Sequence, residues 1–298
     1  MQMAQIQSVL FIYLLIGILC RKAGLVTGPA RQSFTNFLLY VSLPCMVFQS
    51  FDMEFTWDTL RQGALAFVIA LTTAMAALVF GKIAYRRVPA DQRCIMEYGT
   101  LVNNAGFVGL PVVESAYGQA GLFLGSLFII PNRIMMWSAG ISLFTDAPLK
   151  QRIKSVLLNP GIIAVWLGFA RMALRPALPA PAVKALSALG GMSGPLSMIV
   201  IGMILSEIDV RSLLEPKAFV LVAVRQFLFP LALLAVLRLL GADPLTTNIA
   251  VVITGMPIGS STAILADKYG ANAEFASKCV FVSTVTSLVT IPILTLFL

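Results

Sequence analysis

The chain contains no histidine among its 298 residues. This absence argues against most imidazole-based catalysis and against most zinc sites. Charge is also scarce, because only 11% of the residues are charged, whereas a soluble domain carries about 25%. A chain that is 58% hydrophobic cannot cover a surface that faces water. The composition therefore predicts an integral membrane protein that contacts the lipid bilayer.

Cysteine pairs and nucleotide-binding loops are missing as well. Cys20, Cys45, Cys94 and Cys279 are scattered among apolar segments without a CxxC spacing, so they are interpreted as small buried side chains, not as disulfides or metal ligands. No Gly-Lys-Ser/Thr phosphate loop is present, which excludes an ATP-driven pump made of this chain alone. No intramembrane aspartate pair and no nucleophile with a neighbouring base appears. Neither an enzyme nor a cofactor is expected.

The net charge of +8 needs a separate explanation. A basic balance can indicate nucleic acid, but no basic run with interleaved aromatic residues appears, so no nucleic-acid partner is expected. In a membrane chain the excess more often lies in cytoplasmic loops. The first apolar run leads directly into Cys20-Arg21-Lys22 and is interpreted as a retained first helix, not as a cleaved signal.

Long apolar segments fill most of the chain. Since a spanning helix needs about 20 apolar residues, the sequence predicts ten of them, at about 4–20, 32–50, 60–81, 93–114, 120–144, 154–173, 183–206, 217–240, 245–267 and 273–297. Most Lys and Arg residues lie in the odd-numbered links, which predicts that these links face the cytoplasm. Both termini are then outside the cytoplasm, in a multi-pass protein of the cell (inner or plasma) membrane.

Two strings in the fourth and ninth segments echo each other. One is Asn103-Asn104-Ala105-Gly106-Phe107-Val108-Gly109-Leu110-Pro111, and the other is Thr254-Gly255-Met256-Pro257-Ile258-Gly259-Ser260-Ser261. Each has a Gly-x-Pro that should break a helix. Inside a membrane such a break is tolerated only where it is buried in protein or lines a watery cavity. A matched pair of broken segments points to the binding site of a transporter.

Other short strings also match between the halves. Ser42-Leu43-Pro44 corresponds to Ser193-Gly194-Pro195, and Ala116-Tyr117-Gly118 corresponds to Lys268-Tyr269-Gly270. Asp91 and Asp243 each precede a broken segment. With five spans in each half, the second half must be inverted relative to the first. These matches predict inverted repeats over about 1–149 and 150–298, within a single transmembrane transporter unit.

At these residues the chain resembles the auxin efflux carrier family, which includes plant PIN proteins and bacterial malate or malonate permeases. The matching features are Leu39-Tyr40-Val41-Ser42-Leu43-Pro44, the string from Asn103 to Pro111, and the stretch from Gly255-Met256-Pro257 to Tyr269-Gly270. The chain lacks the long cytoplasmic loop of many plant members, which fits a compact prokaryotic protein.

The resemblance implies an all-α integral membrane fold of ten helices, also seen in bile acid–sodium symporters. In that fold a panel domain of helices 1, 2, 6 and 7 moves against a core domain of helices 3, 4, 5, 8, 9 and 10, in which broken helices 4 and 9 cross. The resemblance also implies a secondary active transporter. It would export or exchange small organic anions such as dicarboxylates by elevator-type alternating access.

Candidate substrate-binding residues flank the two breaks. The resemblance implies that an Asn near the crossover contacts the substrate carboxylate, and Asn104 is the closer match, although the sequence does not separate it from Asn103. Hydrogen bonding between helices is the alternative role for both. Hydroxyl groups after the second break could line the site or cap freed carbonyl groups. The further candidates are Gly109, Pro111, Met256, Pro257, Gly259, Ser260 and Ser261.

Two arginines lie inside apolar segments. Arg133 is the most isolated charge in the chain, and at a central position it should face a partner or a cavity. A guanidinium binds a carboxylate at two points, so substrate binding is one role and would favour a dicarboxylate. A structural ion pair with Glu97 or Glu114 is the other role. Arg225 lies near the start of its segment, where snorkelling to the membrane surface is the favoured interpretation.

The sequence does not decide whether transport is coupled to protons or to sodium. Glu97 is the best single candidate for a carboxyl group that binds a proton during transport, because it lies within a predicted segment, one helical turn from Arg93. Sodium would need a cluster of oxygen ligands, which is not evident. The alternatives to the proposed carrier are a sodium-coupled organic anion symporter of the bile acid type and an anion channel. A homodimer is an open option for the oligomeric state.

Overall fold

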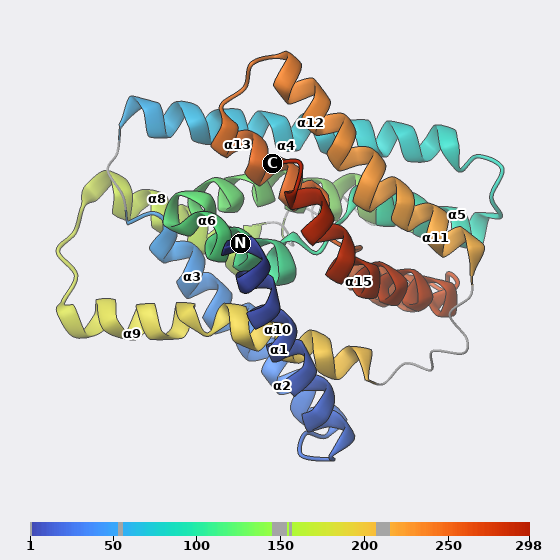
Figure 1. The fold of residues 1–298 in the computed structure, drawn as a ribbon, viewed down its shortest axis with the longest axis horizontal. Helices are drawn as coiled ribbons and strands as arrows, with labels where there is room; N and C mark the ends of the chain where they lie inside the picture. Colours follow the sequence, from blue (N-terminus) through green and yellow to red (C-terminus); the bar gives the residue numbers. More distant parts are fainter. Residues whose placement is uncertain (1, 53–55, 145–153, 155–156, 207–214) are drawn as a thin grey trace. The chain divides into compact units, whose positions relative to one another are not determined.

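The computed structural model describes residues 2–52, 56–144, 154, 157–206 and 215–298. Over these residues the chain is helical, with one isolated antiparallel bridge between Asn103 and Ile258 (Figure 1). The helices are α1 (Gln2–Lys22), α2 (Gly28–Phe37), α3 (Leu43–Ser50), α4 (Trp57–Ala84), α5 (Ala90–Leu101), α6 (Leu110–Met135), α8 (Pro160–Leu174), α9 (Ala180–Gly191), α10 (Ser193–Leu205), α11 (Pro216–Ala223), α12 (Phe229–Leu239), α13 (Pro244–Thr254), α14 (Ser261–Lys268) and α15 (Ala273–Thr295).

Short helical pieces connect several of these elements. Leu38–Ser42 (η1), Ala105–Gly109 (η2), Met136–Gly140 (η3) and Val224–Leu228 (η6) are π-helical, and Ile141–Leu143 (η4) is a 3-10 turn. π turns are rare and often occur at functional sites, and one of these, η2, lies within the first of the two matched strings.

Capping residues explain why several helices begin where they do. The Asn159 side chain accepts a hydrogen bond from the Gly161 amide before α8, and Asp243 accepts one from the Thr246 amide before α13. Both caps are followed by a proline at the first helical position, where its missing N–H is not needed.

Five helical stretches of the described residues are long and apolar enough to cross a membrane. They are Trp57–Ala84, Ala105–Leu143, Ala180–Ile204, Pro216–Leu239 and Ala273–Thr295, and Pro160–Leu174 and Pro244–Thr254 are shorter apolar helices. Helix occupies most of the described part of each of the ten predicted apolar segments, and residues 102–104 and 255–260 interrupt the fourth and the ninth. An all-helical membrane protein is thus confirmed, whereas the count of ten spans and their inverted repeat stay predictions.

The chain divides into two compact units, of which unit 1 contains residues 1–63, 106–126 and 157–208. Within it α1 and α10 cross very closely (Figure 1). A Cβ added at Gly17 would lie 2.1 Å from the Ile199 carbonyl oxygen, and one at Gly202 would lie 2.0 Å from the Leu14 oxygen. Only glycine permits this approach. The matched residues Ser42 and Ser193 join α9, α10 and η1 through a hydrogen bond of 2.8 Å between their hydroxyl oxygens.

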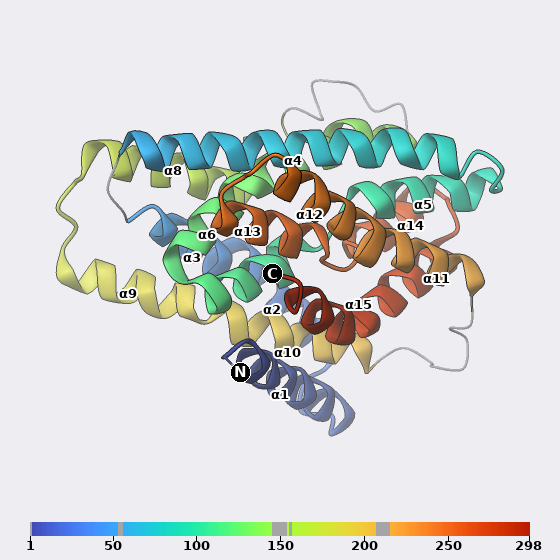
Figure 2. The same ribbon diagram turned by 45° about the horizontal axis from the view of Figure 1, so that its top comes forward.

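Unit 2 contains residues 64–105, 127–156 and 209–298. In it α11 and η6 pack against α15 (Figure 2). The side chain of Gln226, on η6, donates to the Ser283 carbonyl oxygen at 2.5 Å and accepts from the Thr286 hydroxyl at 2.8 Å. A fully buried amide with these partners fixes α15 against the segment that precedes α12.

Two glycines with positive φ end the helices that follow the breaks. Gly118 has φ 63° inside the nominal span of α6, and Gly270 has φ 70° just after α14. Each follows a tyrosine, at the strings that match between the halves. An L side chain rarely adopts this conformation, so the sequence match reflects the same helix ending at both places.

Candidate functional site

The two broken segments meet within unit 2. Helix α5 ends at Leu101 and α13 ends at Thr254, and the extended residues that follow run antiparallel to each other. The Asn104 amide donates to the Pro257 carbonyl oxygen at 2.8 Å, and the Gly259 amide donates to the Val102 oxygen at 3.1 Å. Backbone groups freed by each break are thus satisfied by the other break, which is how such irregular backbone survives in a low-dielectric interior.

Gly259 lets the two backbones come this close. A Cβ at this position would lie 3.3 Å from both the Asn103 carbonyl oxygen and the Val102 side chain. Met256 and Pro257, beside it, are buried. These three predicted residues therefore shape the crossing, and their side chains have little area free for a ligand.

The two asparagines at the first break differ in their surroundings. The Asn103 side-chain amide donates to the Ile253 carbonyl oxygen at 2.5 Å, in the last turn of α13, while its buried Oδ1 has no hydrogen-bond partner among the described residues. The Asn104 side chain is half-buried and forms no hydrogen bond with any described residue. Asn103 thus fulfils the alternative role of joining helices, whereas the donors and the acceptor of the Asn104 amide are available to a ligand.

The second break is followed by the N-terminus of α14. Ser260 occupies the cap position without a side-chain cap hydrogen bond, and Ser261 is the first helical residue. The hydroxyl of Tyr98, a fully buried residue of α5, donates to the Ser261 Oγ at 3.1 Å. A helix N-terminus carries partial positive charge and exposed amides, so it favours an anion.

Arg133 lies close to the same serine. Its Nη1 is 3.6 Å from the Met136 sulfur, and the Ser261 Oγ is 3.9 Å from the same sulfur. The guanidinium forms no ion pair with any residue that the structure describes. Glu97 is instead 3.7 Å from Arg93. The alternative of a structural pair between Arg133 and Glu97 is therefore wrong, and a half-buried cation without an ion pair among the described residues adjoins the α14 N-terminus.

Arg225 is not a snorkelling residue. Its side chain is buried with 3% exposure, and its Nη1 donates at 3.1 Å to the Thr100 carbonyl oxygen, in the last turn of α5. The Nε has no partner within the described part of the chain. The position near the start of its segment suggested the membrane surface, but η6 turns the side chain inward. A cation at the carbonyl end of a helix is electrostatically favoured.

The remaining predicted residues lie elsewhere. Gly109 and Pro111 belong to unit 1, where Pro111 lies beside Gly194. Glu97 is buried with 7% exposure, and Glu114 is half-buried in unit 1. No cluster of three or more Cys, Asp or Glu side chains that could hold a metal ion occurs among the described residues.

Sequence reasoning missed two side chains at this site, Tyr98 and Met136. Tyr98 carries no charge, and the neighbouring Glu97 was the candidate chosen at this place in the sequence. Met136 is uncharged as well, and a methionine in an apolar segment is typical of packing. The available signal for Tyr98 was its short distance along the chain from the first break, which begins after Leu101.

Comparison with known proteins agrees with this architecture. The family model described as membrane transport protein matches residues 2–155 and 147–295. An uncharacterized transporter of Methanothermobacter thermautotrophicus is 24% identical over 294 residues, which covers 95% of this chain and 94% of that protein. A putative malonate transporter of Rhizobium meliloti is 22% identical over 275 residues, covering 89% of this chain and 86% of that protein.

Proposed function

Since the chain belongs to the family of membrane transport proteins, we propose that it is a secondary carrier of small organic anions, with dicarboxylates as the preferred class. Membership makes it a transporter in a membrane and not an enzyme. The finer proposal depends on the arrangement at the second break. There an unpaired guanidinium, a helix N-terminus and a serine hydroxyl adjoin one another.

Charge and geometry at this break support a dianion. One carboxylate fits the amide end of α14 beside Ser260 and Ser261, because that end carries partial positive charge. Arg133 contacts the same sulfur as Ser261, so a second carboxylate a few bonds away can reach it as a two-point partner. The relative named a putative malonate transporter suggests that short dicarboxylates are the first compounds to test.

Alternating access of the elevator type is the proposed mechanism. Unit 1 contains most of the predicted segments 1, 2, 6 and 7, as a panel-like part would, together with residues 106–126 of the predicted segments 4 and 5. Unit 2 contains the antiparallel crossing and most of the other core-like segments. The matched pairs Ser42 with Ser193 and Gly118 with Gly270 support two related halves. A carrier of this kind saturates and exchanges substrate across the membrane, which separates it from an anion channel.

A ligand screen tests the substrate class. Purified protein is expected to gain thermal stability with malonate or malate, and less with monocarboxylates or indole acids, because a ligand that binds only the folded state stabilises it. The screen is repeated over pH and with sodium replaced by potassium. Stabilisation that requires sodium would favour the sodium-coupled symporter, and stabilisation only by monocarboxylates would contradict the dicarboxylate proposal. Counterflow in proteoliposomes then distinguishes a carrier from a channel.

We expect Glu97 to carry the proton if transport is proton-coupled. Its carboxyl group is largely buried in α5 but also lines a cavity at the start of that helix, so a proton can reach it from that cavity. Glu97→Gln should leave counterflow within about twofold of the parent value while abolishing uptake driven by a pH gradient, because exchange needs no net proton movement. The matched control is Glu114→Gln in unit 1. Gradient-driven uptake that survives Glu97→Gln would exclude this residue.

A further inference from the structure

Unit 2 has a cavity whose lining does not include the residues of the crossing. Its volume is about 600 Å³, which is in the range of small-molecule sites. Four stretches of chain line it: the end of α4, the first turns of α5, η4 with Phe144, and the link between α14 and α15. The links among these stretches are odd-numbered ones, so the cavity opens on the side that the loop charges predict to be cytoplasmic.

Two of the three cations that line this cavity have no close partner among the described residues. Lys82 and Arg86, four residues apart where α4 ends, form no hydrogen bond or ion pair with any residue that the structure describes. Arg93, the third cation of the lining, pairs with Glu97, with 3.7 Å between the Arg93 Nε and the Glu97 Oε1. Like charges gathered around one concave space raise the local potential and attract anions.

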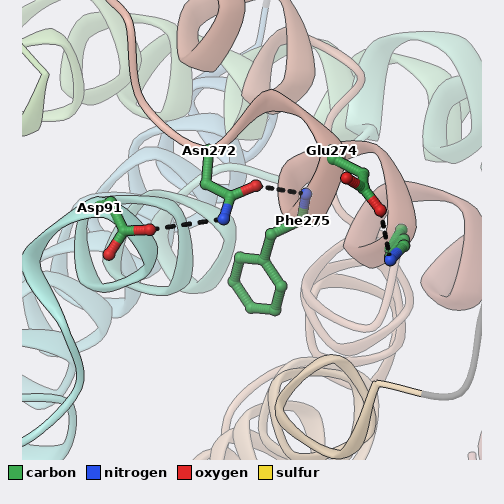
Figure 3. A network of polar contacts seen from close by, with 5 residues as sticks. Asp91, Asn272, Glu274 and Phe275 are labelled. Carbon is green, nitrogen blue, oxygen red and sulfur yellow. Dashed lines mark hydrogen bonds and ion pairs between the residues drawn. The ribbon is translucent and has the colours of Figure 1, made fainter.

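The other carboxylate of the lining is already engaged. Asp91 accepts a hydrogen bond of 3.3 Å from the Asn272 side chain, whose Oδ1 in turn accepts one of 3.0 Å from the Phe275 amide and so caps α15. Figure 3 shows the Asp91 carboxylate directed at Asn272 and away from Glu274, which forms an ion pair with Lys278 on α15. This network joins α5 to α15 and fixes that wall of the cavity.

An apolar floor separates the cavity from the crossing. Leu143, Phe144 and Tyr269 line the cavity and also pack against the buried cluster that contains Tyr98. The Phe144 and Tyr98 rings meet edge to face, with 5.3 Å between their centroids. The opposite end of Tyr98 donates its hydroxyl to Ser261. One tyrosine therefore contacts both the floor of the cavity and the start of α14.

We propose that this cavity is a second anion-binding site, which takes a small dianion bearing carboxylate or phosphate groups. Lys82 and Arg86 bind the charged groups of the dianion. Arg93 leaves its ion pair with Glu97 and pairs with the dianion instead. Its organic part lies on Phe144 and Tyr269. The source is either a soluble metabolite or an anionic lipid headgroup, since both present the same chemistry. The site does not depend on the proposed substrate, because none of its cations belongs to the crossing.

Neighbouring arginines provide a matched test. Inorganic phosphate is titrated into purified protein carrying Arg133→Gln, so that the crossing contributes little to the signal, and binding is followed by calorimetry and thermal shift. We expect Lys82→Gln and Arg86→Gln each to raise Kd by about threefold, and the double variant by about tenfold, as fits partly solvated charge pairs. Arg87→Gln removes the same charge from the adjacent exposed residue, outside the lining, and should leave Kd unchanged.

Two outcomes would overturn the site: no phosphate binding in the Arg133→Gln background, or an equal loss with Arg87→Gln, which would reduce the effect to net charge. Nanodiscs identify the source. If phosphate binds in neutral phosphatidylcholine and is displaced when phosphatidylglycerol is included, the natural ligand is a headgroup; if it is not displaced, the ligand is soluble. Failure of this test leaves the carrier proposal intact, because the carrier proposal is measured with the parent protein and with dicarboxylates.

Discussion

Arg133→Gln is expected to abolish uptake of the transported dicarboxylate while the protein stays folded. The guanidinium is unpaired among the described residues and contacts the Met136 sulfur, which Ser261 also contacts. Removing one partner of a desolvated charge pair costs about 2–5 kcal/mol, which corresponds to a loss of about 30-fold or more in affinity. Radiolabelled uptake into proteoliposomes measures the loss. Gel filtration and thermal unfolding measure whether the fold survives.

Two companions make the Arg133 result specific. Arg133→Lys keeps the charge but loses the planar fork, so it should retain binding of a monocarboxylate better than binding of a dicarboxylate. Arg175→Gln removes an exposed arginine after α8 and should transport as the parent does. Parent-like uptake by Arg133→Gln would remove this residue from the site. A collapse of thermal stability would instead assign it a structural role.

The second break was predictable from local chemistry, whereas the first lies apart from its motif. A Gly-x-Pro inside an apolar segment removes a donor and relaxes the backbone, and α13 ends at Thr254, directly before Gly255-Met256-Pro257. The prediction that Gly109-Leu110-Pro111 breaks a helix is wrong: the interruption lies at residues 102–104, and η2 continues into α6 through that string, with Pro111 as the second residue of α6. The positive φ of Gly118 and Gly270 was also within reach, because a repeated Tyr-Gly at the end of a helix favours a left-handed glycine. These features depend on a few neighbouring residues, so the sequence determines them directly.

The inward direction of Arg225 was not predictable in this way. Position along a segment gives the depth of a residue, but not the face of the helix on which it lies. The π turn at Val224–Leu228 decides that face, and it turns both Arg225 and Gln226 into the interior. The surroundings of Gln226 come from Ser283 and Thr286, 57 and 60 residues away in the chain. Local spacing contains no information about such partners.

The roles of Asn103 and Asn104 also needed the structure. Both are amides next to one break, and in sequence they are equivalent. The register of the bridge to Ile258 distinguishes them, because it directs the Asn103 amide to the Ile253 carbonyl oxygen and leaves the Asn104 side chain without a described partner. This difference in hydrogen bonding predicts opposite effects of alanine at the two positions.

Asn104→Ala is expected to raise the KM for the dicarboxylate by about tenfold or more without a change in melting temperature. A hydrogen bond to a charged group contributes about 1.5–3 kcal/mol, and truncation of the Asn104 side chain breaks no hydrogen bond with a described residue. Asn103→Ala should do the reverse. It leaves the Ile253 carbonyl oxygen, at the end of α13, without its donor in a buried place, which costs about 1–3 kcal/mol of stability.

KM and melting temperature are measured for both alanine variants, because each variant should change one quantity and leave the other unchanged. Asn103→Asp provides a further control, because it keeps the size of the side chain but replaces the donor with an acceptor that faces the Ile253 oxygen, so it should destabilise more than alanine does. If Asn103→Ala changes KM and leaves the melting temperature alone, the two assignments are exchanged. If both variants act only on stability, then the anion is held by the α14 N-terminus and Arg133 without an asparagine, and the crossing serves to align those two groups.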